Sequence, residues 1–231
     1  MSMQPLVLLP GLRCDAHLWH AVAAGLSDLA APTIPNLTLD DTITDMAKRV
    51  LVSAPARFAL AGLSMGGYVA LEIMRQAPER VTHLALLDTS ARPDTEERKT
   101  ARRAEMALVV QGKASLVSRT SLPNLLAAHH VGGPVGDAVH DMAMRVGDAA
   151  YYRQQEAIMG RADSRPHLAG IKVPTLVGVG AEDRLTPPEL AEEMAAAIPD
   201  AEMVVFPEAG HVSTLENPLA VIEAMRAWLA R

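Results

Sequence analysis

The segment that most constrains the fold of this chain is Gly62-Leu63-Ser64-Met65-Gly66. It follows the apolar run 58–61 and opens an amphipathic stretch at Gly67, so the pattern predicts a strand that turns sharply into a helix with Ser64 at the turn. Glycines two residues before and after the serine remove side chains that would collide with the strand and the helix. A serine that only caps a helix gives part of this pattern. A nucleophilic role for Ser64 therefore depends on the rest of the chain.

An acid and a histidine follow the serine, each after a predicted strand. Asp183 comes after the apolar run 174–179, and His211 comes after the run 203–206. Because parallel strands deliver their following loops to the same edge of a sheet, we expect Ser64, Asp183 and His211 to meet there, as nucleophile, orienting acid and base. Asp88, at the end of the run 81–87, is the alternative acid. The spacing Gly180-x-x-Asp183-x-x-x-Pro187 favours Asp183.

Two backbone amides are candidates for stabilising an oxyanion. The run 6–9 predicts a buried strand that leads into Pro10-Gly11-Leu12. The N–H of Leu12 and the N–H of Met65, the residue after the serine, form the natural pair of donors to a carbonyl oxygen under attack.

With these four motifs in this order, the chain resembles the α/β-hydrolase superfamily, and within it the small, capped, cofactor-free, esterase-like members. The resemblance covers residues 5–91 and 166–231. It implies a mostly parallel α/β sheet flanked by helices, a Ser64–His211–Asp183 triad, an oxyanion hole at Leu12 and Met65, and no cofactor. One departure is Pro10-Gly11, which stands where His-Gly is usual.

Alternating strand and helix patterns support this fold class. Strands are predicted at roughly 5–9, 31–34, 57–62, 81–87, 174–179 and 202–206, and helices at roughly 17–27, 42–53, 66–77, 188–197 and 218–230. The first strand begins almost at residue 1, so we expect six parallel strands without the two leading strands of the full superfamily sheet. Thr186-Pro187-Pro188-Glu189 predicts a capping box, and Asn217-Pro218 predicts another helix start.

The alternation stops between residues 92 and 165, where the pattern is helical. We expect a helical cap at 92–165 inserted into a core of 1–91 and 166–231; the alternative is an extension of the core. Its apolar residues suggest a deformable lining rich in leucine and methionine, and ordinary packing between helices is the alternative for most of them individually. They are Met106, Leu108, Val109, Val110, Leu116, Leu122, Leu125, Leu126, Met142, Met144 and Met159. His129, His130 and His140 lack the spacing of zinc ligands, so no metal is expected.

Charge and cysteine content limit the partners and the compartment. The formal net charge of -6 offers no basic surface for nucleic acid or anionic lipid. The single cysteine, Cys14, excludes an internal disulfide and suits a reducing compartment. We therefore expect a cytoplasmic protein that acts on a small molecule, and the oligomeric state is not predicted.

Hydrolysis of carboxylic esters is the reaction that this set of residues favours. Hydrolysis of enol-lactones, thioesters or carbon–carbon bonds uses the same residues, and the sequence does not separate these reactions. A cofactor-free lyase or oxygenase, or a ligand receptor without catalysis, would also fit the fold.

Overall fold

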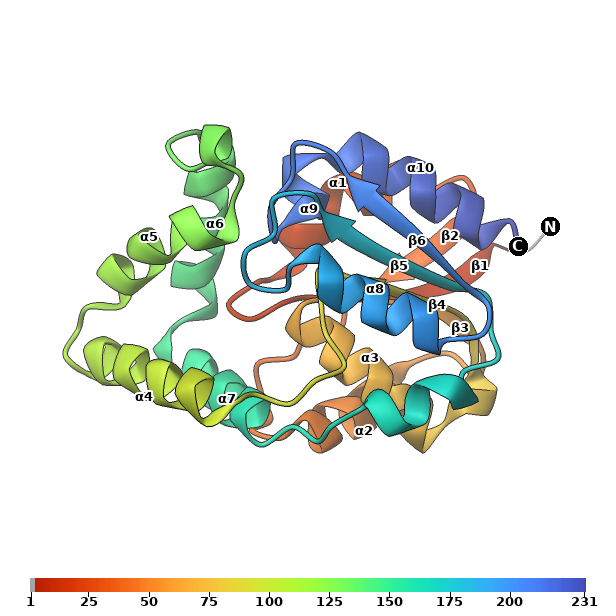
Figure 1. Cartoon of the computed structure of the whole chain (residues 1–231), viewed down its shortest axis with the longest axis horizontal. Coiled ribbons are helices and arrows are strands. Elements are labelled where there is room, and N and C mark those ends of the chain that lie inside the picture. The colour runs from red at the N-terminus through yellow and green to blue at the C-terminus, as the bar shows by residue number, and fades with distance from the viewer. Residues whose placement is uncertain (1–2) are drawn as a thin grey trace.

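The computed structural model describes residues 3–231 and is built around one six-stranded sheet (Figure 1). The strands are β1 (Gln4–Leu9), β2 (Ala30–Thr33), β3 (Phe58–Leu63), β4 (Val81–Leu87), β5 (Thr175–Gly180) and β6 (Ala201–Phe206). They lie in the order β2-β1-β3-β4-β5-β6, and each neighbouring pair is parallel. The prediction of six parallel strands is confirmed, and every observed end lies within one residue of the predicted end.

Helices cover both faces of this sheet. One face packs against α2 (Ile43–Ser53), α3 (Met65–Gln76) and α8 (Pro188–Ala197), and the other against α1 (His20–Gly25) and α10 (Pro218–Leu229). Strands β3 and β5 are buried along their whole length, which explains why they appear in the sequence as continuous apolar runs. Short 3₁₀ helices occur at Ala16–Trp19, Pro78–Arg80, Ala128–His130 and Arg165–Gly170, and the one-turn helix α9 spans Ser213–Glu216.

Four helices lie between β4 and β5 in the chain: α4 (Glu96–Val110), α5 (Ala114–Leu125), α6 (Pro134–Val146) and α7 (Asp148–Met159). We call them the helical insertion. In Figure 1, α5 and α6 stand apart from the sheet, on the side toward which the arrowheads of β5 and β6 point. The insertion therefore lies beside the carboxyl ends of the strands, where the predicted site residues are.

No described helix is both long enough and apolar enough to cross a membrane.

Candidate active site

Ser64 lies at the turn between β3 and α3 in a strained backbone conformation. Its φ is 54°, a left-handed value that costs a residue with a side chain on the order of 1 kcal/mol or more. The turn is also crowded, because a Cβ on Gly62 would lie 2.2 Å from the carbonyl oxygen of Gly66, and a Cβ on Gly66 would lie 2.1 Å from that of Leu9. The two flanking glycines are thus required by close backbone contacts.

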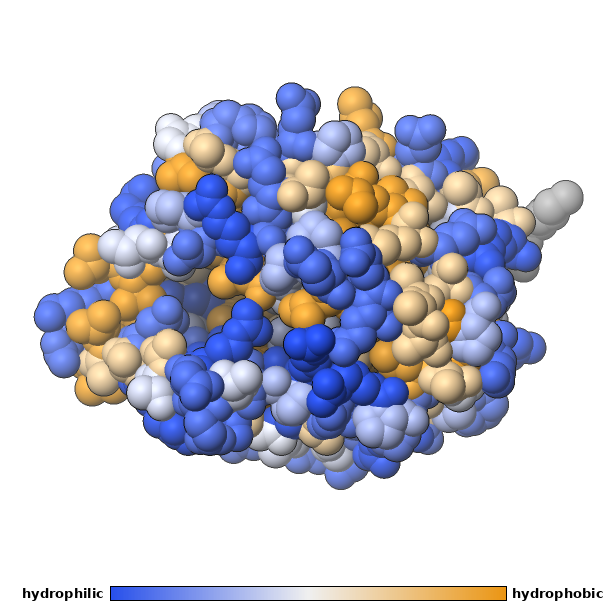
Figure 2. All heavy atoms as spheres, in the orientation of Figure 1, coloured by the Kyte–Doolittle hydropathy of each residue, from blue (hydrophilic) through white to orange (hydrophobic). Residues whose placement is uncertain are grey.

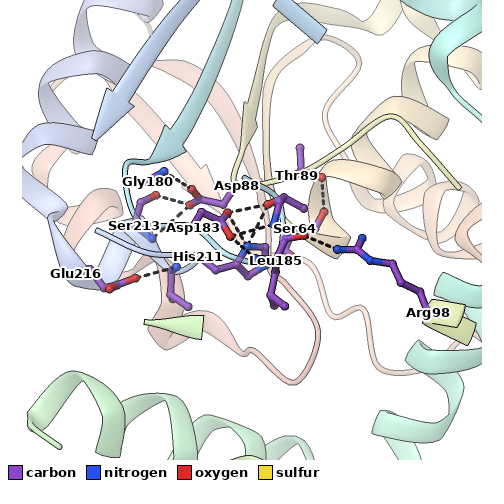
Figure 3. Close-up of polar contacts among 12 residues, drawn as sticks. Ser64, Asp88, Thr89, Arg98, Gly180, Asp183, Leu185, His211, Ser213 and Glu216 are labelled. Carbon is purple, nitrogen blue, oxygen red and sulfur yellow. Dashed lines mark hydrogen bonds and ion pairs between the residues drawn. The ribbon is translucent and has the colours of Figure 1, made fainter. Parts of the chain in front are cut away.

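The structure joins Ser64, His211 and Asp183 in one chain of hydrogen bonds (Figure 3). The hydroxyl of Ser64 is 2.8 Å from Nε2 of His211, and Nδ1 of the same ring is 2.8 Å from Oδ2 of Asp183. The three residues come from the loops after β3, β5 and β6, which meet at the carboxyl edge of the sheet. This arrangement lets the ring accept a proton from the hydroxyl while the carboxylate fixes the tautomer of the ring.

Asp183 is held by its own loop. Its Oδ1 accepts hydrogen bonds from the amides of Leu185 (2.8 Å) and Thr186 (3.0 Å), and its Oδ2 accepts one from the hydroxyl of Thr186 (2.7 Å). The predicted capping box at Thr186 is therefore wrong: helix α8 begins at Pro188 with no side-chain cap, because the threonine hydroxyl is bound to the carboxylate. The cap predicted at Asn217 is present, since its side chain accepts from the amide of Ala220.

The opposite charges of His211 and Asp183 shift the pKa values of both groups. Burial, the largest single effect, lowers the pKa of His211, but Asp183 together with the carboxylates of Asp88 and Glu216 outweighs burial and raises this pKa above its ordinary value. Burial alone would raise the pKa of Asp183, but His211 and the donors of Thr186 outweigh it and lower this pKa. The carboxylate is therefore ionised at neutral pH, and it stabilises positive charge on the ring.

Asp88 makes no hydrogen bond to His211 among the described residues. It is fully buried; its Oδ1 accepts from the amide of Gly180 (2.8 Å), and its Oδ2 accepts from the hydroxyl of Ser213. Burial, together with the charge of Asp183, raises the pKa of Asp88 to about 8. The alternative acid thus joins the end of β4 to the end of β5 and to the start of α9, and Asp183 is the carboxylate that contacts His211.

The amides of Leu12 and Met65 lie on the two segments that meet beside Ser64. Met65 is the first residue of α3, so its N–H has no partner within the helix. A Cβ on Gly11 would lie 3.5 Å from Cβ of Ser64, which places the loop after β1 directly against the serine. The two segments that carry these candidate donors thus lie next to Ser64.

A buried glutamine fixes the loop that carries Leu12. Arg13, the next residue, has a φ of 59°, and its N–H donates to Oε1 of Gln154 at 3.0 Å. Nε2 of Gln154 donates to the carbonyl of Leu37 at 3.1 Å, and this glutamine is fully buried. Because Gln154 belongs to α7, the helical insertion holds the backbone next to the candidate oxyanion donor.

A cavity of about 350 Å³ opens onto Ser64 and His211. Its wall includes residues of the insertion and of the core, and the space-filling view shows a hollow among the helices of the insertion, with both hydrophilic and hydrophobic side chains around it (Figure 2). Of the apolar insertion residues expected to form a lining, only Leu108 and Leu125 do so. The expected methionine-rich lining is wrong. Met142 packs into the core and Met144 is exposed, and the lining instead combines apolar residues such as Val117, Val139 and Leu185 with serine, threonine, asparagine and arginine side chains.

The insertion is also bonded to the loop that carries His211. The amide of His211 donates to the carbonyl of Leu125 at 2.7 Å. The buried carboxylate of Glu216 accepts from the amide of Ala127 at 2.7 Å and from that of Val212 at 3.0 Å. Residues 125–127 and the loop after β6 therefore form one hydrogen-bonded unit.

Sequence reasoning missed Gln154, Arg13 and the contact of Thr186 with Asp183. Gln154 is separated from its partners by 141 and 117 positions, and no local pattern reports such a pairing. The contact of Thr186 could have been predicted from the sequence. A hydroxyl three residues after an acidic residue in a tight loop can donate to that carboxylate instead of capping the next helix.

Comparison with known proteins agrees with this geometry. The chain is similar to a thermophilic esterase from Thermogutta terrifontis (TM-score 0.90, 30% identity, 99% of this chain and 90% of that one). It is also similar to the enol-lactonase from Burkholderia xenovorans LB400 (TM-score 0.88, 26% identity, 100% and 93%). In sequence it is 26% identical to the pimeloyl-[acyl-carrier protein] methyl ester esterase of Citrobacter koseri, over 96% of this chain and 92% of that protein. The model of the alpha/beta hydrolase family matches residues 6–224, and the chain belongs to this family.

Proposed function

We propose that this protein hydrolyses carboxylic esters of small to medium size, with Ser64 as nucleophile, His211 as general base and Asp183 as the acid that orients it. The observation that carries the proposal is the hydrogen-bonded chain from the Ser64 hydroxyl through both nitrogens of His211 to Asp183, with 2.8 Å at each step. Two relatives named as esterases support the ester as the substrate class.

The reaction would proceed through an acyl-enzyme. His211 accepts the proton of Ser64 as the hydroxyl oxygen attacks the ester carbonyl, and the amides of Leu12 and Met65 donate to the resulting oxyanion. Protonated His211 then gives its proton to the leaving alcohol. Water, deprotonated by the same ring, attacks the acyl-enzyme and releases the acid, which leaves Ser64 free.

The helical insertion would act as the cap of this site. It contributes much of the wall of the cavity that opens onto Ser64, and such a cap excludes water and limits the size of the substrate. The domain boundaries of 1–91 and 166–231 for the core and 92–165 for the cap remain predictions. A cytoplasmic location, expected from the single cysteine, also remains a prediction.

Hydrolysis of an enol-lactone is the second candidate. Such a lactone presents the same acyl carbon and oxygen leaving group to the serine, and the similar structure from Burkholderia xenovorans LB400 is that of an enol-lactonase.

A fluorophosphonate probe tests the nucleophile. We expect one added mass on the intact protein, mapped to Ser64, and no addition to Ser64→Ala, because only an activated hydroxyl reacts. A panel of p-nitrophenyl esters, lactones and thioesters then assigns the substrate class. We expect Ser64→Ala to fold normally and to lose hydrolysis; a residual rate within about tenfold of the wild-type rate would contradict the covalent mechanism.

A further inference from the structure

Two cavities of similar size meet at the side chain of Tyr68. The active-site cavity, of about 350 Å³, opens onto Ser64. A second cavity, of about 370 Å³, lies among α2, α3, the loop after β4 and the end of α7. Among the described residues, Tyr68 is the only one that lines both cavities. Its side chain therefore belongs to the boundary between them.

The position of Tyr68 on α3 places it beside the nucleophile. Tyr68 follows Ser64 by four residues, and residues four apart lie on the same face of a helix, one turn from each other. Side chains on a helix lean toward its N-terminus, so the side chain of Tyr68 leans toward the turn that carries Ser64. A substrate chain that extends from a carbonyl at Ser64 toward α3 would therefore meet this ring.

The boundary between the two cavities is thin. On α7, Ala157 lines the second cavity, whereas the next residue, Ile158, lines the active-site cavity. Tyr68 forms the boundary on the side of α3, and only 7% of its surface is exposed. Loss of the ring would therefore join the two spaces, whereas loss of a side chain elsewhere in the active-site wall would not.

The ring of Tyr68 is also held in place. The guanidinium of Arg161 lies over this ring, 4.1 Å from its centroid, which is the geometry of a cation–π contact. Arg161 in turn donates to the carbonyls of Ile158 (2.9 Å) and Arg92 (3.1 Å). It also pairs with the buried carboxylate of Asp94 at 2.9 Å. A ring packed against so firmly held a neighbour acts as a fixed wall for the substrate.

We infer that Tyr68 sets the longest substrate chain that the active site accepts, so that a smaller side chain at this position extends the site toward the second cavity. Each methylene that fits strengthens binding in the transition state until the chain meets the ring. The wall of the second cavity includes the apolar residues Ile43, Ala91 and Ala157, against which the end of a longer chain would pack. This inference rests on the proposed ester hydrolysis.

The chain-length profile of Tyr68→Ala tests this role. We would measure kcat/KM for p-nitrophenyl esters of increasing acyl length and for alkyl acetates of increasing alcohol length. The quantity compared is the ratio of kcat/KM for an ester about four carbons longer than the best wild-type substrate to kcat/KM for that best substrate. In one of the two series, Tyr68→Ala should raise this ratio by at least about tenfold, because each newly buried methylene is worth about fourfold. A folded Tyr68→Ala with wild-type ratios in both series would overturn the inference.

Three further variants make the result specific. Tyr68→Phe keeps the ring and should keep the wild-type ratio, and a rise as large as that of Tyr68→Ala would overturn the inference. Leu108→Ala enlarges the active-site cavity at a residue that does not line the second one, so an equal rise there would overturn the assignment to Tyr68. Because Tyr68 packs in the core, Tyr68→Leu serves as a milder variant if Tyr68→Ala does not fold. It should raise the ratio by at least about fourfold, and an unchanged ratio would overturn the inference.

Labelling of Ser64 separates this inference from the proposed function. Alkylphosphonyl fluorides of graded chain length add to an activated serine in one step, with loss of fluoride, and mass spectrometry follows the rate without any turnover. Relative to wild type, Tyr68→Ala should favour the long-chain probe over the short-chain probe by at least about tenfold. If no ester is hydrolysed but this preference is seen, the proposed function fails and the role of Tyr68 stands. If esters are hydrolysed while neither the ratio of kcat/KM nor the labelling preference changes, only the inference fails.

Discussion

Replacing Gln154 by leucine tests whether the helical insertion holds the oxyanion loop in place. Leucine has a similar volume, so the substitution removes the amide without opening a large cavity. The N–H of Arg13 and the carbonyl of Leu37 then lose their partners in a fully buried place. At about 1–3 kcal/mol for each unsatisfied group, we expect the free energy of unfolding to fall by about 2–6 kcal/mol.

The same substitution should also lower the rate of the chemical step. Without the bond from Gln154, the strained φ of 59° at Arg13 is free to relax, and the neighbouring amide of Leu12 moves with it. Loss of one oxyanion donor in other enzymes costs about 10²–10³ in kcat, which sets the upper limit of the effect here. We expect a fall in kcat of about 10-fold or more, within that limit, with a smaller change in KM, because the oxyanion exists only during reaction.

Gln155→Leu is the matched control. Gln155 is the next residue on α7 and is equally buried, but it bonds to Arg102 and Tyr151 rather than to the loop after β1. Urea unfolding should show that both variants lose stability, and ester hydrolysis should show the larger loss of kcat in Gln154→Leu. Equal losses of kcat in the two variants, or wild-type kcat in Gln154→Leu, would refute the role of Gln154 in positioning the loop.

Four further expectations concern the titratable groups and the size of the cavity. Asp183→Asn should lower kcat by about 10⁴, by analogy with the same substitution in serine proteases, whereas Asp88→Asn should lower it far less; the reverse order in a steady-state assay would move the acid to Asp88. Since Asp183 raises the pKa of His211, kcat/KM should fall on acidification with a midpoint above the ordinary histidine value of 6.5, and a pH–rate profile with a lower midpoint would contradict this. The pKa of Asp88 is raised from 3.8 to about 8, so between these pH values the folded state holds a proton that the unfolded state has lost. The protein should therefore lose stability as the pH rises from about 4 to about 8. Asp88→Asn should flatten this decline when thermal unfolding is measured across that range. In a homologous series of neutral esters, each methylene that fits should add up to about 0.8 kcal/mol of transition-state binding until the wall of the cavity is met, so a flat profile from acetate to a long chain would mean an open site.

The fold was predictable because its four inner strands, β1, β3, β4 and β5, are buried over most or all of their length. Such strands appear as short apolar runs between helical stretches, and the loops after them carry Ser64, Asp183 and His211 to one edge. These positions follow from chain order and from the parallel direction of the strands, so the sequence was enough to expect the three side chains to meet.

The cavity wall was not predictable in the same way. Leucine and methionine on a helix face either the core or a pocket, and the choice depends on how the helices of the insertion cross one another. Met142 turned out to pack against the core, and a mixture of polar and apolar residues of α4 and α5 lines the cavity instead. The bond from Gln154 to Arg13 joins residues far apart in sequence, and it has no local pattern.

The bonds between residues 125–127 and the loop after β6 have a consequence for protein engineering. In a fold whose cap were attached only by its two connecting segments, one insertion could be exchanged for another at those two points. Here the amide of His211 is held by the carbonyl of Leu125, and the amide of Ala127 is held by Glu216. A chimera that replaced the insertion between β4 and β5 would therefore leave the histidine loop without its supports, unless the new segment supplied a carbonyl and an amide at these same two places.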